Sequence, residues 1–190
     1  AIAAVQTAVE SGVTYFDVAP GYGDGRAEKV YGEALEPHRD KIFLATKFWP
    51  GTDWNPAKAT DDLKASLERL KTKEVDLLQY HGLGIDDAVE ATIHEKGMLD
   101  WLREQQATGR CRWLGISAEG PSGALERLLI TKTFDVGLFA YNLIYQSMCD
   151  YQRDPAGILP LAKSLGMGVA TMRPATSGFI QKLLKKEFPE

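Results

Sequence analysis

The sequence has 190 residues, of which 44% are hydrophobic and 25% charged, and its formal net charge is −4. This composition is typical of a globular protein with a core of ordinary size, and the lack of a basic surplus argues against nucleic acid as the main partner. No apolar run approaches the roughly 20 residues of a membrane span, and Cys111 and Cys149 have neither metal-binding nor redox spacing. We therefore expect an intracellular, cytoplasmic protein with reduced thiols.

Strands and helices are predicted to alternate along the whole chain. Residues 1–11 have apolar side chains at helical spacing and stop at Gly12, which predicts a first helix. Residues 13–17 are rich in β-branched and aromatic side chains, which predicts a buried strand ending in Asp17. Further strands are predicted over residues 41–47, 75–81, 111–117, 134–141 and 167–172. Further helices are predicted over residues 28–35 and 86–108 and from Pro56, Pro121, Pro155 and Ser177 onward.

This alternation predicts parallel strands joined by crossover helices. An open doubly wound sheet and a (β/α)8 barrel both have this pattern. No Gly-x-Gly-x-x-Gly motif follows a strand, and polar residues end at least four strands, which favours the barrel. Because a complete barrel needs eight units and about 250 residues, we expect residues 1–190 to form a single, partial barrel domain of about six units, with one strand missing at each end.

Three successive predicted strands end near titratable side chains. Asp17 ends the first strand and Tyr22 follows in its loop, Lys47 ends the second strand, and His81 ends the third. An isolated Asp17 could simply cap its loop, but in a barrel the four side chains would meet, and Lys47 would partner the buried carboxylate. A cation near Tyr22 favours the phenolate, so this phenol could exchange a proton with a carbonyl oxygen that His81 holds by a hydrogen bond.

The predicted site has no nucleophile–base pair, and no metal-ligand cluster appears in the sequence. Such a site could move a proton but would need a hydride from elsewhere, which implies a nicotinamide cofactor. A hydrolase on the same barrel is the least favoured interpretation.

The motifs around these residues resemble those of the aldo-keto reductase superfamily. They are residues 16–23 (FDVAPGYG), 45–49 (ATKFW), 66–70 (SLERL), 76–81 (DLLQYH) and 115–117 (GIS). The resemblance runs from Gly12 to Gly178. It implies a (β/α)8 barrel that reduces a small-molecule aldehyde or ketone with NADPH, with NADH not excluded.

The resemblance also implies a role for individual residues. Tyr22 would be the general acid, Asp17 and Lys47 its tuning pair, and His81 the group that orients the carbonyl. Substrate contacts would come from Tyr22, Trp49 and His81. Cofactor contacts would come from Asp17, Ser117, Met172 and Arg173, and no metal is implied.

The sequence departs from the family pattern at three positions. Ala118 stands where Asn is usual, Leu138 where Gln is usual, and Met172 where an aromatic side chain stacks on the nicotinamide. Each lost buried hydrogen bond would weaken cofactor binding by about 1–3 kcal/mol. These departures suggest an alternative function, a non-catalytic cofactor-sensing or regulatory subunit of the same superfamily. A third possibility is a fragment without a function of its own, because missing strands would leave two open sheet edges.

Overall fold

The computed structural model describes residues 1–50, 54–82, 97–119, 123–142, 157–174 and 176–187. The chain divides into two compact units, one of residues 1–81 and 88–115 and the other of residues 82–87 and 116–190. The single-domain interpretation of the sequence stays a prediction. No helix in the described ranges is both long enough and apolar enough to cross a membrane.

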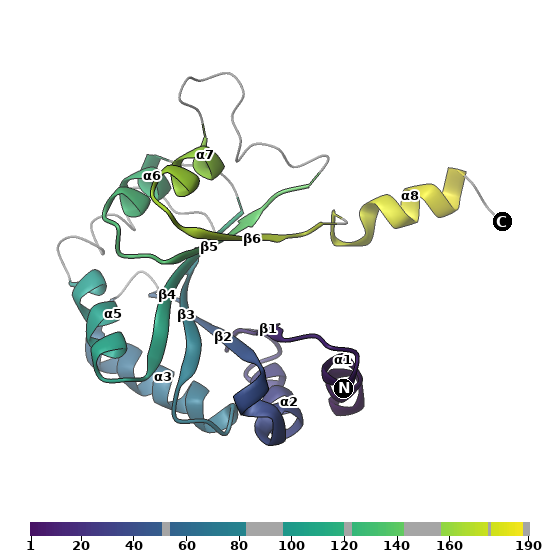
Figure 1. Ribbon diagram of the computed structural model, residues 1–190, viewed down its shortest axis with the longest axis horizontal. Coiled ribbons are helices and arrows are strands. Elements are labelled where there is room, and N and C mark those ends of the chain that lie inside the picture. The colour runs from purple at the N-terminus through teal and green to yellow at the C-terminus, as the bar shows by residue number, and fades with distance from the viewer. Residues whose placement is uncertain (51–53, 83–96, 120–122, 143–156, 175, 188–190) are drawn as a thin grey trace. The chain divides into compact units, whose positions relative to one another are not determined.

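The described residues of the first unit form four helices, a 3-10 helix, two complete strands and all but the last residue of a third. In Figure 1, helices α2, α3 and α5 lie along one face of strands β1 to β4, and α1 packs against α2. In chain order the elements are α1 (Ile2–Glu10), β1 (Tyr15–Asp17), α2 (Arg26–Leu35), the 3-10 helix η1 (Glu36–Lys41), β2 (Phe43–Phe48), α3 (Pro56–Arg69), β3 (Val75–Gly82), α5 (Met98–Ala107) and the first part of β4 (Cys111–Ala118).

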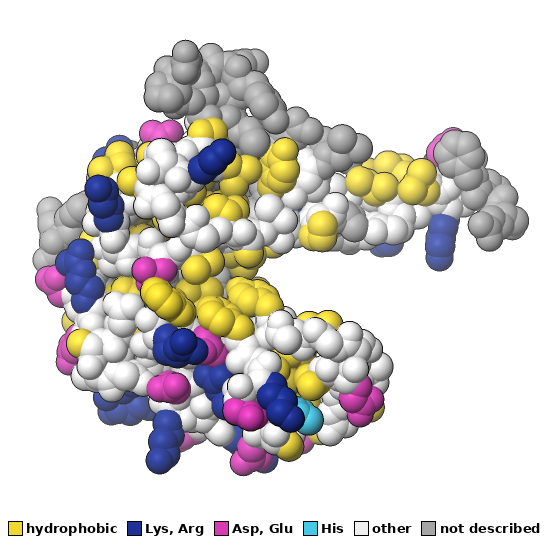
Figure 2. Space-filling view, in the orientation of Figure 1, with side chains coloured by type: hydrophobic (Ala, Val, Ile, Leu, Met, Phe, Trp, Pro, Cys, Tyr) yellow, Lys and Arg dark blue, Asp and Glu magenta, His cyan; other side chains and the backbone are white. Residues whose placement is uncertain are grey.

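The second unit continues the same alternation. Helices α6 and α7 pack against each other, and α7 also packs on β6. On α8, the apolar side chains Phe179, Leu183 and Leu184 are 42–56% exposed, and Figure 2 shows hydrophobic side chains gathered along this helix. The elements after β4 are α6 (Gly123–Ile130), β5 (Val136–Ala140), α7 (Ile158–Ser164), β6 (Gly168–Met172), the 3-10 helix η2 (Thr176–Gly178) and α8 (Phe179–Glu187).

The six strands are hydrogen-bonded in the order in which they follow along the chain. The pairs β1–β2, β2–β3 and β5–β6 are parallel. A doubly wound sheet reverses its strand order at a switch point, whereas a (β/α)8 barrel adds each new strand beside the last. The predicted fold class is therefore confirmed, with six of eight βα units in the described ranges.

The predicted elements differ from the observed ones mainly at their ends. Strand β1 begins at Tyr15 instead of residue 13, because the N–H of Val13 donates to the carbonyl of Ala8 (3.0 Å) and so closes the end of α1. Gly12, with φ of 86°, provides the left-handed turn that this helix end requires. The helix starts predicted at Pro121 and Pro155, and residues 86–96 of the long predicted helix, lie outside the described residues, as does the side chain of Ser177.

A buried carboxylate holds the start of β3. Asp76 is 3% exposed and accepts a hydrogen bond from the backbone N–H of Leu44 (2.9 Å). It also pairs with Arg39 (2.8 Å) and Arg112 (2.9 Å). Two cations and one N–H offset the cost of removing this charge from water. The interaction ties β2, β3 and β4 together near their N-terminal ends.

Helix α2 approaches the end of α3 so closely that one position requires glycine. A Cβ on Gly32 would lie 2.2 Å from the carbonyl oxygen of Arg69 and 2.9 Å from the carbonyl carbon of Leu70. Both atoms belong to the backbone and cannot rotate away.

Replacing Gly32 with Ala should therefore force the two helices apart. We expect Gly32→Ala to lower the free energy of unfolding by about 3 kcal/mol, the upper range for overpacking, in urea titrations. Gly21→Ala is the matched control, because a Cβ on Gly21 meets no atom within 4 Å. Equal unfolding midpoints for the two variants would contradict this account of the helix contact.

Candidate active site

The register of the first three strands places the candidate residues on one face of the sheet. Asp17 lies opposite Ala45, and Lys47 lies opposite Gln79. Because side chains alternate between the two faces along a strand, Asp17, Lys47, Gln79 and His81 share a face. These polar side chains thus lie near the ends of adjacent strands, because each of them follows a run of apolar residues that forms the strand.

A buried ion pair lies at the centre of this face. Lys47 is only 3% exposed, and its ammonium group donates hydrogen bonds to both carboxylate oxygens of Asp17, the one to Oδ2 at 2.6 Å. It also donates to the backbone carbonyl of Val18 at 3.0 Å. An ammonium this deeply buried is costly unless a counter-charge and acceptors surround it. The expected pairing of Asp17 with Lys47 is present.

Tyr22 and His81 lie next to this pair. The ammonium nitrogen of Lys47 is 5.1 Å from the centroid of the Tyr22 ring. The rings of Tyr22 and His81 meet edge to face with centroids 5.9 Å apart. Tyr22 is 45% exposed, so its phenol is accessible from solvent. The four residues that the sequence predicts to meet are therefore brought together within the first unit.

The loop that carries Tyr22 is held by backbone hydrogen bonds. The N–H of Tyr22 donates to the carbonyl of Ala19 (3.0 Å), and the N–H of Gly25 donates to that of Pro20 (2.8 Å). Gly25 has φ of 79°, a left-handed conformation that glycine adopts without strain. These turns hold the backbone of Tyr22 beside the strand ends, and α2 begins after them at Arg26.

A second buried ion pair supports the site from the helix side. Glu28 of α2 is fully buried, and it accepts hydrogen bonds from the Thr46 hydroxyl (2.7 Å) and from Nε of Arg69 (2.7 Å). The Arg69 side chain runs past Gly25, where a Cβ would lie 2.8 Å from its Cδ. This network joins the strand that carries the lysine to the helix that follows the tyrosine loop.

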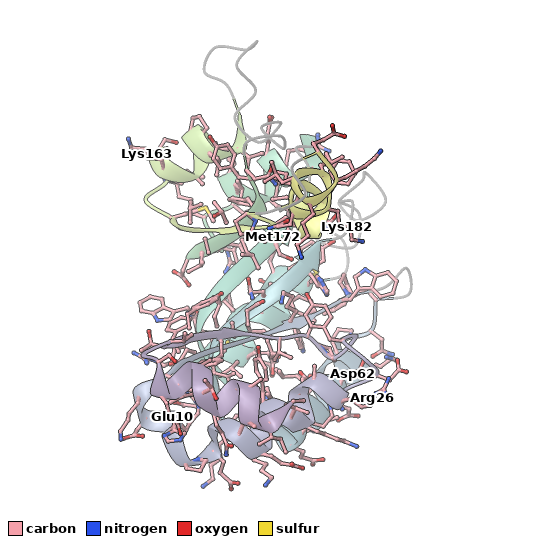
Figure 3. All side chains as sticks on the ribbon, turned by 90° about the vertical axis from the view of Figure 1, so that its right-hand side faces the viewer. Glu10, Arg26, Asp62, Lys163, Met172 and Lys182 are labelled. Carbon is pink, nitrogen blue, oxygen red and sulfur yellow. The ribbon has the colours of Figure 1, made fainter. Side chains whose placement is uncertain are left out.

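The other predicted site residues are Trp49 in the first unit and Ser117, Met172 and Arg173 in the second. Trp49 follows β2 and is 69% exposed. Within the second unit, Ser117 is buried near the end of β4, and Met172 is half-buried at the end of β6 (Figure 3). Arg173 has φ of 60°, its guanidinium pairs with Glu119, and its carbonyl accepts a hydrogen bond from Asn142 (2.6 Å).

Sequence reasoning alone missed two residues that touch the ion pair or its strand. Neither Gln79 nor Glu28 stands out in the sequence, because a polar residue inside an apolar strand and an acid in the first turn of a helix are both common. The alternation of β3 was the available signal, since it places Gln79 on the face of His81. Over the described ranges, no group of three His, Cys, Asp or Glu side chains could hold a metal ion.

Comparisons with known proteins show the family to which the chain belongs. The family model described as the aldo/keto reductase family matches residues 1–189. The chain is 31% identical over 189 residues to an uncharacterized oxidoreductase, YqkF, of Bacillus subtilis, covering 95% of this chain and 57% of that protein. It is 39% identical over 118 residues to the methylglyoxal reductase YeaE of Escherichia coli, covering 61% of this chain and 38% of that protein.

Solved structures show the same fold. An aldo/keto reductase from Klebsiella pneumoniae, crystallised with NADP and acetate, has a TM-score of 0.77 at 24% identity and covers 97% of this chain and 62% of its own. The holo form of aldo-keto reductase AKR11C1 from Bacillus halodurans has a TM-score of 0.70 at 27% identity, covering 93% and 58%. The chain thus spans less than two thirds of the length of these relatives.

The Glu28–Arg69 pair leads to a stability prediction. Glu28→Gln removes the charge opposite Arg69, which is 24% exposed, and should lower the free energy of unfolding by about 3 kcal/mol. The matched control is Asp62→Asn, because the Lys58–Asp62 pair is 72% and 63% exposed and should contribute about 0.5 kcal/mol or less. Urea titration of both variants decides the point, and a Glu28→Gln protein as stable as the control would contradict it.

A second prediction concerns alkaline pH. The pKa of the Tyr31 phenol lies above its ordinary value because the side chain is half-buried and, to a smaller extent, because Asp17 and Tyr22 disfavour a further negative charge. A pKa raised on folding stabilises the folded state below the unfolded pKa, and this stability is lost as the pH rises further. Between about pH 9 and 11 the wild type should therefore lose stability more steeply than Tyr31→Phe. Thermal unfolding across that range tests this, and parallel curves would refute it.

Proposed function

Because the chain belongs to the aldo/keto reductase family, we propose that it reduces an aldehyde or ketone to the alcohol, with Tyr22 as the general acid. The observation that carries the proposal is the Asp17–Lys47 ion pair lying beside the accessible Tyr22 phenol. A reductase needs a proton donor at the carbonyl oxygen, and these residues supply one.

The chain's own residues would handle the carbonyl oxygen and its proton. The substrate oxygen would lie between Oη of Tyr22 and the imidazole of His81, whose rings are already in edge-to-face contact. Tyr22 would donate its hydroxyl proton to that oxygen as negative charge develops there. The nearby Lys47 ammonium would stabilise the phenolate left behind, and Asp17 would hold that ammonium in place.

The described residues fit a reduced nicotinamide cofactor, which supplies a hydride when bound. None of the four residues at the ion pair can provide a hydride, so the donor set itself calls for one. Ser117 could hydrogen-bond the carboxamide, the thioether of Met172 could pack on the ring, and Arg173 could attract the phosphates. Two family structures crystallised with NADP or NADPH support NADPH as this cofactor.

The substrate is proposed to be a small carbonyl compound. The Escherichia coli relative that matches 61% of this chain is named a methylglyoxal reductase. Methylglyoxal and a simple aromatic aldehyde are therefore suitable first probes. The exposed Trp49 next to β2 is proposed to form part of the pocket wall, where an aromatic ring would exclude water from the reacting carbonyl.

A second candidate function is supported by two buried side chains. Ala118 and Leu138 are 2% and 8% exposed and stand where the family resemblance expects amides. Neither can hydrogen-bond a nicotinamide carboxamide. A regulatory subunit that senses the cofactor without turning it over would tolerate these changes, and it would bind NADPH but leave every carbonyl probe unreduced.

The test of the proposed function is the substitution Tyr22→Phe. We expect turnover of NADPH with methylglyoxal to fall by about 10²–10⁴-fold, the usual contribution of a general acid, while NADPH binding followed by nicotinamide fluorescence stays unchanged. Tyr31→Phe removes another phenol from the same unit and should leave turnover unaltered. Retained turnover in Tyr22→Phe would refute the mechanism, and cofactor binding without turnover in the wild type would favour the regulatory function.

A further inference from the structure

One buried amide contacts the ion pair and is not explained by packing. Gln79 of β3 is fully buried and lies in register with Lys47. Its Nε2 donates a hydrogen bond to Oδ2 of Asp17 at 3.1 Å. Its Oε1 is the one buried side-chain nitrogen or oxygen in the described part of the chain that lacks a hydrogen-bond partner.

The unpartnered oxygen is a consequence of the hydrogen bond to Asp17. A carboxylate only accepts, so the amide must turn its NH2 group toward Asp17, and its carbonyl then points elsewhere. A buried acceptor without a partner lowers stability, and an apolar side chain of the same length would avoid this loss. Stability alone therefore does not explain an amide at this position. The feature that can explain it is the hydrogen bond that its NH2 group donates to Asp17.

The hydrogen bonds at Asp17 show what the amide adds. Oδ2 of Asp17 accepts from both Lys47 (2.6 Å) and Gln79 (3.1 Å). If the Lys47 ammonium were its only donor, the Asp17 carboxylate could still rotate, because the Asp17 side chain is about one fifth exposed. A second, neutral donor on β3, which is separated from β1 by β2, fixes the carboxylate plane without adding charge. The ammonium is then held in one position beside the Tyr22 ring.

We propose that Gln79 is a positioning residue that sets the Asp17–Lys47 pair and, through it, the environment of the Tyr22 phenol. The proposal rests on the proposed function for its effect on catalysis but not for its effect on the ion pair. It predicts that loss of the amide donor loosens Asp17 and makes the buried ammonium of Lys47 more accessible.

The first experiment needs no catalytic turnover. Gln79→Met keeps the length of the side chain but removes the donor. Reaction of the chain with trinitrobenzenesulfonate, followed residue by residue by mass spectrometry, should modify Lys47 severalfold faster in Gln79→Met than in the wild type. Lys58, whose side chain is 72% exposed, is the internal control and should react equally in both proteins. Equal modification of Lys47 in the two proteins would overturn the proposal, whatever the activity.

The second experiment uses the pH profile of activity to distinguish a positioning role of Gln79 from a packing role. In Gln79→Met, kcat should fall by about 10-fold, typical for the loss of an outer-shell partner, with unchanged NADPH affinity and no loss of stability. Gln79→Glu supplies a donor only while its new carboxyl is protonated. Its activity should resemble the wild type at acidic pH and fall as that carboxyl ionises beside Asp17. Asp17 and Lys47 lie beside this position and His81 shares its face of the sheet, and all three residues are common to both proteins.

The possible outcomes are distinguishable. A wild type without turnover would refute the proposed reductase, and the Lys47 modification rates would still decide the role of Gln79. If Gln79→Met retains full kcat, or if Gln79→Glu has the pH profile of the wild type, Gln79 does not position the pair. If both variants lose stability and activity together at every pH, the amide is a packing residue and the proposal is wrong.

Discussion

The burial of the Lys47 ammonium is the constraint on which the site depends. A lysine at 3% exposure cannot stay charged without a counter-ion and acceptors, so the end of β2 requires Asp17 on the strand beside it. Asp17 can reach Lys47 because β1 and β2 are parallel neighbours with Asp17 opposite Ala45, two residues before the lysine. The strand order therefore makes the ion pair possible, and a different order would leave the buried Lys47 ammonium without its counter-charge.

Two buried carboxylates outside the site keep this arrangement in place. Asp76 joins β2, β3 and β4 near the strand starts, and Glu28 joins α2 and α3 to Thr46, the residue before Lys47. Breaking such a pair costs more than forming it gains, because the remaining charge stays buried. These interactions therefore contribute more to fixing how the helices align with the strands than to overall stability. This alignment in turn sets where the titratable side chains meet.

The sequence predicted the fold and the meeting of four residues because both depend on local patterns. Apolar runs that end in Asp17, Lys47 and His81 identify strands and their carboxyl ends, and parallel order follows from the helices between them. The start of β1 could not be predicted, since Val13 is β-branched yet its N–H closes α1. Gln79 and Glu28 were missed for a related reason. Their importance lies in contacts with residues 62 and 18 positions away, which no local pattern records.

The features that distinguish the two candidate functions lie in different units of the chain. Asp17, Tyr22, Lys47 and His81 all belong to the first unit, and the contacts that join them lie within it. The residues that depart from the family pattern, Ala118, Leu138 and Met172, belong to the second. Replacing a buried ion pair by well-packed apolar residues is often neutral for stability, so stability alone does not require a buried ammonium next to an accessible phenol. The ion pair and the buried amide beside it are therefore the features that support the proposed proton transfer, whereas the three departures support the regulatory alternative.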